Sequence, residues 1–113
     1  MASNTVKRIF GPVALTTTLT TNIYNNTSAL IYDIIRHIHI CNKSSSGVAV
    51  SLWLGASGAN AAGTELFNLF NIPANSTYDY YCTLKVLSTD FLVGGANGAT
   101  ALSIYAEGEQ GVV

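Results

Sequence analysis

The sequence predicts an all-β domain, folded as an antiparallel β-sandwich or jelly roll. Apolar and polar residues alternate with a period of two in several short runs, and turn-forming residues separate these runs at near-regular intervals. The chain is also rich in residues that suit strands and turns, with 12 Thr, 10 Ser, 10 Asn and 10 Gly. We expect seven to eight short strands, and the pattern is compatible with both a seven-stranded sandwich and an eight-stranded jelly roll.

Length and composition limit the possible partners. A chain of 113 residues fits one domain, and a hydrophobic content of 49% excludes intrinsic disorder. Charged residues make up only 10% and the net charge is -1, so no strong field attracts nucleic acid or an anionic membrane. A neutral, polar surface of this kind suits close packing of identical copies.

Residues 1–28 are expected to form an N-terminal arm and first edge strand, ahead of a sandwich core at residues 29–113. Thr5–Phe10 fits a short strand, whereas Thr16–Thr21 has five threonines in six positions and needs a neighbour to pair with. An ordinary edge strand and loop is slightly favoured over an arm that reaches a second subunit. No apolar segment resembles a signal peptide, so we expect synthesis in the cytoplasm, with Cys41 and Cys82 as reduced thiols.

The central part of the chain is the most regular. Between Ile34 and Asn42 the alternation places Ile34, Ile38 and Ile40 on one face and His37, His39 and Cys41 on the other, with Arg36 as a misfit on the apolar face. Between Val48 and Leu54, Val48, Val50, Leu52 and Leu54 oppose Ala49, Ser51 and Trp53. Because a polar turn separates the two runs, we predict that they form a hairpin with one buried face.

The remaining segments are predicted from the same pattern. Gly55–Gly63 is a flexible loop, and the apolar residues of 66–70 fit either one helical turn or a strand of about six residues, of which the strand is preferred because Pro73 is close. Thr77–Leu87 alternates, and further strands are expected at Phe91–Gly94 and Ala101–Glu107. One face of Thr77–Leu87 carries Tyr78, Tyr80, Cys82, Leu84 and Val86.

The only metal-like pattern is His37-x-His39, followed by Cys41. Alternate residues of a strand point to the same side and can converge on one ion. Two histidines do not complete a site, and a closed site in one subunit would need Cys82 and another ligand. A solvent-facing or interface stripe is therefore the favoured interpretation, and no cofactor is expected.

No catalytic constellation is evident, and we predict that the protein is not an enzyme. No serine lies in the Gly-x-Ser-x-Gly motif of a nucleophile elbow. The glycine-rich segment at 94–98 lacks the lysine of a phosphate loop. The carboxylates are expected in solvated turns and strand ends; they are Asp33, Glu65, Asp79, Asp90, Glu107 and Glu109. Four Asn-x-Ser/Thr matches, at Asn25, Asn26, Asn42 and Asn75, are expected by chance in such a composition.

The aromatic residues allow two interpretations. Tyr78, Tyr80 and Tyr81, with Trp53 and Tyr105, could form a platform for sugars or bases. The favoured alternative is that Tyr78 and Tyr80 fill the core, with their hydroxyl groups at its rim.

Four segments carry a resemblance to a known group of proteins: IYDIIRHIHICN at Ile31–Asn42, VAVSLWLG at Val48–Gly55, IPANSTYDYYC at Ile72–Cys82 and LSIYAEGE at Leu102–Glu109. In this order they resemble small β-sandwich virion proteins of tailed bacteriophages, over roughly residues 31–110. The Thr- and Asn-rich segment before Ile31 departs from that group. The resemblance implies a structural, non-catalytic virion protein.

Within that group, the small size, the low charge and the expected N-terminal arm favour a capsid decoration protein on the outside of the head, bound to the major capsid protein or other virion proteins as a homo-oligomer, with a trimer favoured. A tail or baseplate subunit that contacts the host is the alternative. A lectin-like module using Tyr78, Tyr81, Trp53 and the loop at 55–63 is the second alternative. The interface candidates are Lys7, Arg8, Phe10, His37, His39 and Trp53.

Overall fold

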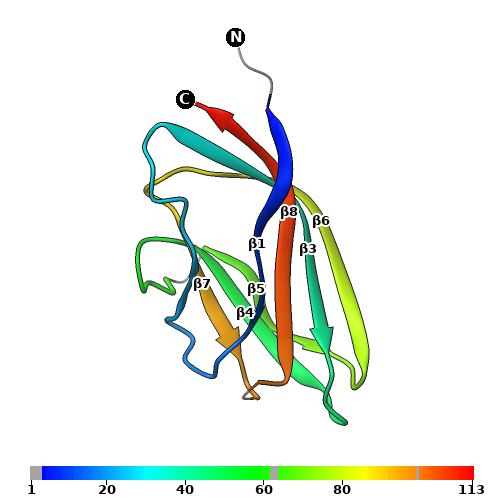
Figure 1. The fold of residues 1–113 in the computed structure, drawn as a ribbon. Coiled ribbons are helices and arrows are strands. Elements are labelled where there is room, and N and C mark those ends of the chain that lie inside the picture. Colours follow the sequence, from blue (N-terminus) through cyan, green and yellow to red (C-terminus); the bar gives the residue numbers. More distant parts are fainter. Residues whose placement is uncertain (1–3, 62–63, 99) are drawn as a thin grey trace.

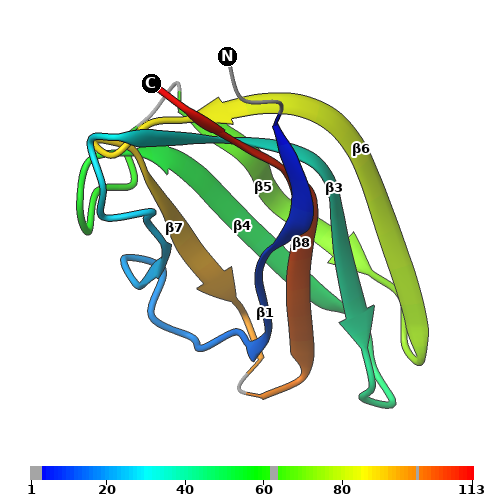
Figure 2. The ribbon, with the colours of Figure 1, turned by 45° about the horizontal axis from the view of Figure 1, so that its top comes forward.

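The computed structural model describes residues 4–61, 64–98 and 100–113, and it confirms an all-β sandwich (Figures 1 and 2). Met1–Ser3 of the expected arm and Ala62 and Gly63 of the expected loop lie outside the described residues. The strands are β1 (Thr5–Ala14), β2 (Asn22–Tyr24), β3 (Ile31–Asn42), β4 (Val48–Gly55), β5 (Glu65–Ile72), β6 (Ser76–Val86), β7 (Phe91–Ala96) and β8 (Leu102–Val112). In the described part of the chain, no helix is long and apolar enough to span a membrane.

The strand order is that of an eight-stranded jelly roll. One sheet has the order β1-β8-β3-β6 and the other β2-β7-β4-β5, and every pairing is antiparallel. The first strand thus pairs with the eighth, the second with the seventh, the third with the sixth and the fourth with the fifth. This nested pairing defines the jelly roll and selects it over the seven-stranded sandwich.

The predicted hairpin between residues 34 and 54 does not form. Both strands exist, but β3 pairs with β6 and β8, whereas β4 pairs with β5 and β7 in the other sheet. Residues 43–47 therefore carry the chain from one sheet to the other (Figure 2). The apolar faces of the two strands face each other across the core instead of lying side by side, which buries both of them.

The core lies between the sheets and consists of the inward side of each alternating strand. Ile38 and Ile40 of β3 and Val50 and Leu52 of β4 are fully buried. Each such side chain contributes about 1.5–3 kcal/mol relative to an exposed position. The predicted inward face of β6 is also confirmed, because its alternate residues pack against this core.

A β-bulge in β3 explains the misfit of Arg36. The pairing of β3 with β8 shifts between Ile35 and His37, so β3 has one extra residue there relative to β8. The core therefore contains Ile35 together with Ile38 and Ile40, and Arg36 is exposed. The prediction that Ile34 shares the buried face was wrong, because the bulge reverses the alternation.

The bulge requires a close approach of the neighbouring strand. Gly108 of β8 lies opposite Ile35, and a Cβ atom at position 108 would collide with the carbonyl oxygen of Ile34. Glycine permits this approach because it has no side chain.

The N-terminal region packs against the rest of the chain. β1 is an edge strand paired with β8, and the following segment, 15–21, runs along β7 (Figure 1). The amides of Ala96 and Gly94 donate to the carbonyls of Thr16 and Thr21, at 2.9 and 3.0 Å. The threonine-rich segment thus finds its pairing partner within the same chain.

The strand predicted for residues 66–70 is confirmed by β5. This strand lies at one edge of the sheet β2-β7-β4-β5. A bulge opposite Ser51 lets the Ser51 hydroxyl accept a hydrogen bond from the amide of Leu69 at 2.9 Å. Leu69 and Phe70 remain exposed at this edge.

Candidate functional site

The candidate site is built on the outer face of β3, where His37 and His39 project on the same side. Pairing with two neighbours places a side chain on each flank of each histidine. Asp79 of β6 and Tyr105 of β8 lie opposite His39, whereas Tyr81 and Glu107 lie opposite His37. Side chains at such cross-strand positions are within contact distance. We call these six residues the histidine array: His37, His39, Asp79, Tyr81, Tyr105 and Glu107.

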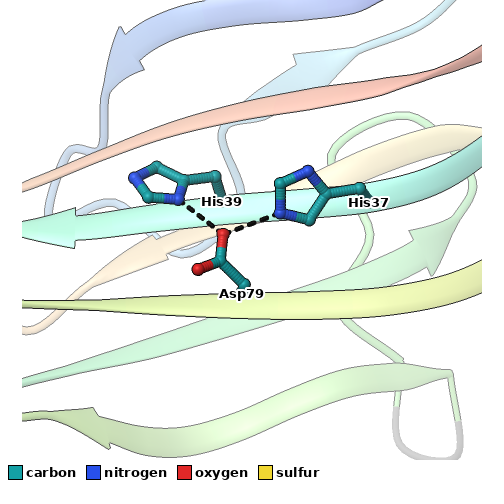
Figure 3. A group of neighbouring side chains, drawn as sticks. All are labelled: His37, His39 and Asp79. Carbon is teal, nitrogen blue, oxygen red and sulfur yellow. Dashed lines mark hydrogen bonds and ion pairs between the residues drawn. The ribbon is translucent and has the colours of Figure 1, made fainter.

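One carboxylate oxygen joins the two imidazoles (Figure 3). Asp79 Oδ1 lies 2.6 Å from Nδ1 of His39 and 2.7 Å from Nε2 of His37. An ionised carboxylate only accepts hydrogen bonds, so both nitrogens act as donors in this arrangement. Asp79 is the third polar partner that the His-x-His pattern lacks in sequence.

The second nitrogen of His37 also faces an acid. Nδ1 of His37 lies 3.5 Å from Oε1 of Glu107, on the side of the ring away from Asp79. His37 is therefore flanked by two carboxylates, one on each neighbouring strand.

Two tyrosine rings hold the imidazoles in place. The Tyr81 ring stacks on His37 with a centroid separation of 4.7 Å and an interplanar angle of 10°. The Tyr105 ring stacks on His39 at 4.9 Å and 27°. These contacts restrict rotation of the two imidazole rings, whose nitrogens point at Asp79.

The hydrogen bonds also stabilise the charge of Asp79. Those from His39 and, second, from His37 hold the pKa of the Asp79 carboxyl below its ordinary value. Among the described residues, His37, His39 and Asp79 form the one group of three potential metal-binding side chains whose ligand atoms lie within 4.8 Å of one another.

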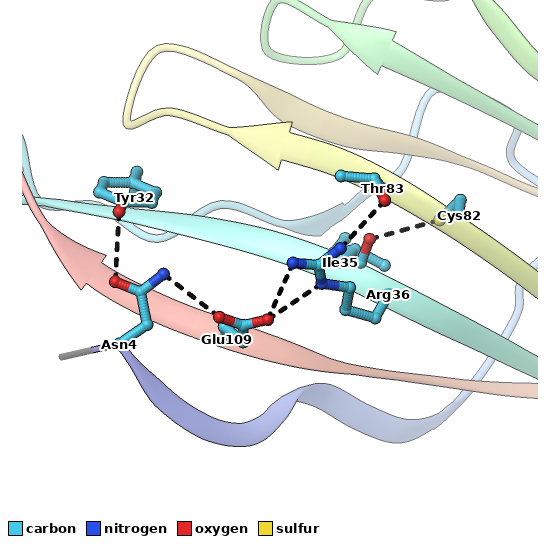
Figure 4. A network of polar contacts seen from close by, with 7 residues as sticks. All are labelled: Asn4, Tyr32, Ile35, Arg36, Cys82, Thr83 and Glu109. Atoms are coloured by element: carbon cyan, nitrogen blue, oxygen red, sulfur yellow. Dashed lines mark hydrogen bonds and ion pairs between the residues drawn. The ribbon is translucent and has the colours of Figure 1, made fainter.

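A second polar network continues along the same face (Figure 4). Arg36 donates to Glu109 Oε2 from Nε and Nη2, both at 3.0 Å, and to Thr83 Oγ1 at 3.1 Å. Asn4 donates to Glu109 at 3.3 Å and accepts from the Tyr32 hydroxyl at 3.2 Å. This network is exposed, so each contact contributes about 1 kcal/mol or less.

The two cysteines are not part of the histidine array. Both are free thiols, as expected. Cys82 lies on the core side of β6, opposite to Asp79 and Tyr81, and its Sγ donates to the Ile35 carbonyl at 3.4 Å. Cys82 therefore cannot supply the further metal ligand that was considered from the sequence. Burial raises the pKa of the Cys82 thiol.

The other interface candidates are dispersed. Lys7 and Arg8 are exposed on β1, and the Arg8 guanidinium lies over the Tyr105 ring at 5.8 Å. Phe10 is half-buried and stacks on Tyr24 at 5.4 Å. Trp53 lies on the face of β4 opposite to the core residues but is only 6% exposed.

The proposed aromatic platform is not assembled. Tyr81 is exposed on the outer face of β6, Tyr78 packs against the core and Trp53 belongs to the other sheet. Tyr78 and Tyr80 instead form a cluster with Phe67, at centroid distances of 6.0 and 4.9 Å. This agrees with the interpretation that these two tyrosines fill the core.

The expectation that all carboxylates are solvated is wrong for Asp33. Its carboxylate is fully buried between the sheets and accepts hydrogen bonds from the Tyr24 hydroxyl and, at 3.0 Å, from Gln110 Nε2. Burial is the largest cause of the raised pKa of Tyr24, and the hydrogen bond to Asp33 raises it further. Sequence alternation alone could not find this contact, because Tyr24 and Asp33 belong to different sheets.

One of the glycosylation-like matches has a structural role. Asn42 is fully buried, and its Nδ2 donates to the carbonyls of Ser46, Ile72 and Pro73, while its Oδ1 accepts from Ser44. Its amide therefore ties together two loops at one end of the sandwich.

Comparison with known proteins gives no family assignment. No protein-family model matches the chain, and no curated protein matches it at a significant level.

Proposed function

We propose that this protein is a structural component of a tailed-bacteriophage virion, a decoration protein on the outside of the head. Two features support the proposal: the resemblance of four segments to small phage virion proteins, and the jelly-roll strand order, an architecture used in many viral capsid proteins. Fold-level similarity is an analogy, so the surface of the molecule must supply the physical argument.

The observation that carries the proposal is a group of exposed aliphatic side chains at one end of the sandwich. Leu30, Val112 and Val113 are 74%, 71% and 75% exposed, and the Val113 amide donates to the Leu30 carbonyl at 2.9 Å. We call Leu30, Val112 and Val113 the aliphatic end.

Exposed aliphatic groups that gather in this way are typical of surfaces that bind another protein. Because the net charge is only -1, long-range attraction contributes little, and apolar burial is the main source of affinity available to this surface. The aliphatic end is therefore the surface expected to contact the capsid.

The first test is the copy number in purified virions of the source phage, measured by quantitative mass spectrometry against the major capsid protein. A number that matches the capsid lattice supports decoration. A few copies per particle would instead indicate a tail or baseplate subunit, and absence from virions would refute a virion role.

The second test is re-attachment to virions that lack the protein. Leu30→Asp and Val112→Asp are expected to abolish attachment, because each places a charge in the apolar contact. Leu69→Asp is the matched control, since Leu69 is 62% exposed but lies on the edge strand β5. Equal attachment of all three variants would show that the aliphatic end is not the contact surface.

A further inference from the structure

The donor set of the histidine array is that of a transition-metal site. Two imidazole nitrogens and one carboxylate oxygen converge from adjacent strands, with no backbone change needed to bring them together. Imidazole ligands favour Zn²⁺ and its neighbours in the first transition row, whereas Ca²⁺ and Mg²⁺ prefer oxygen alone.

Side-chain movements are needed to bring the three ligand atoms to metal-binding distances. Zinc–nitrogen and zinc–oxygen bonds of about 2.0–2.2 Å require ligand atoms about 3–3.5 Å apart. The two nitrogen–oxygen distances are 2.6 and 2.7 Å, and all three ligand atoms lie within 4.8 Å of one another, so the imidazoles must draw closer together and the carboxylate must retreat to admit an ion. Asp79 can do this because its side chain is partly exposed.

We propose that His37 Nε2, His39 Nδ1 and Asp79 Oδ1 bind one divalent transition-metal ion, with Zn²⁺ as the natural occupant. Three protein ligands leave a coordination position open on the exposed side of the sheet for water or for a group from another molecule. This inference does not depend on the proposed virion role.

Binding requires each coordinating nitrogen to present a lone pair. In a neutral imidazole the proton moves to the other ring nitrogen, which for His37 is Nδ1, facing Glu107 at 3.5 Å. A histidine ligand that donates its second N–H to a carboxylate is the usual outer-shell arrangement in metal sites. Glu107 thus positions His37, and the stacked tyrosines limit rotation of both rings.

The proposal is tested by titrating the tag-free chain with ZnCl₂ by calorimetry and with CoCl₂ by visible absorption, near neutral pH. Saturable binding of one ion per chain is expected, together with the Co²⁺ absorption bands of a site with nitrogen and oxygen ligands. No saturable binding of either metal, or one ion shared by two or three chains, would refute a site formed by these three ligands in one chain.

Variants separate the site from non-specific binding. Asp79→Asn, His37→Gln and His39→Gln are expected to abolish saturable binding, whereas Asp90→Asn, which removes one carboxylate from a turn elsewhere, leaves it unchanged. Glu107→Gln is expected to weaken binding about tenfold, as is usual for an outer-shell partner. Circular dichroism checks that each variant is folded, and binding that persists unchanged in folded Asp79→Asn would overturn the assignment.

Discussion

The carboxylate of Asp33, fully buried on β3, accepts a hydrogen bond from the hydroxyl of Tyr24, which belongs to the opposite sheet. This bond links the two layers of the sandwich. It also gives a hydrogen-bond partner to a polar side chain that is fully buried.

Tyr24→Phe is expected to destabilise the fold by about 1–3 kcal/mol, because it leaves a buried carboxylate oxygen without a donor. Urea unfolding measures the change. Tyr32→Phe is the control, since it removes an exposed hydroxyl bonded to Asn4, and its effect should stay within about 0.5 kcal/mol. Equal effects of the two substitutions would contradict the structural role of the Tyr24–Asp33 contact.

The stability of the fold is expected to decline in alkaline solution. Tyr24 and Cys82 have raised pKa values in the folded state, so the unfolded chain releases these protons first, from ordinary values of 10.0 and 9.0. The folded state then binds more protons than the unfolded state, and the free energy of unfolding falls as pH rises above these values. Urea unfolding across this range should show the decline.

Tyr24→Phe provides the control for this pH dependence. It lacks the phenol, so the difference in stability between it and the wild-type protein should shrink as the pH rises above 10. A difference that stays constant with pH would show that Tyr24 does not contribute to the decline.

Gly108→Ala tests the bulge in β3. The added methyl group collides with the Ile34 backbone, and relieving this collision is expected to cost about 1–3 kcal/mol. Gly55→Ala is the matched control, because a Cβ atom at that position meets no atom within 4 Å. Thermal unfolding compares the two, and the bulge geometry is contradicted if both variants melt at the wild-type temperature.

Asn42→Ala is expected to destabilise the fold by about 1–3 kcal/mol, because the buried carbonyl of Ile72 loses its donor together with the partly buried bonds to Ser46 and Pro73. Asn68→Ala removes an exposed amide from β5 and should change stability by no more than about 0.5 kcal/mol. Chemical denaturation measures the free energy of unfolding of both variants and tests whether the side chain of Asn42 holds the two loops together.

The strands could be predicted from the sequence because alternation is a local signal, as in β6 and β4. Strand partners could not, since β3 and β4 are adjacent in sequence and yet bury their apolar faces from opposite sheets. Arg36 marked the bulge as a misfit, but only the pairing with β8 showed which isoleucine turns inward. The histidines were found by spacing, whereas Asp79 joins them through a pairing about 40 positions away in sequence.

The position of β8 has a consequence for synthesis. Residues Leu102–Val112 are synthesised after β1–β7, and yet they occupy the middle of a sheet, between β1 and β3. Until they emerge, both of these strands present unpaired backbone edges that can pair with another chain. The nascent protein is therefore most prone to aggregation before β8 emerges, and insertion of β8 between β1 and β3 ends that period.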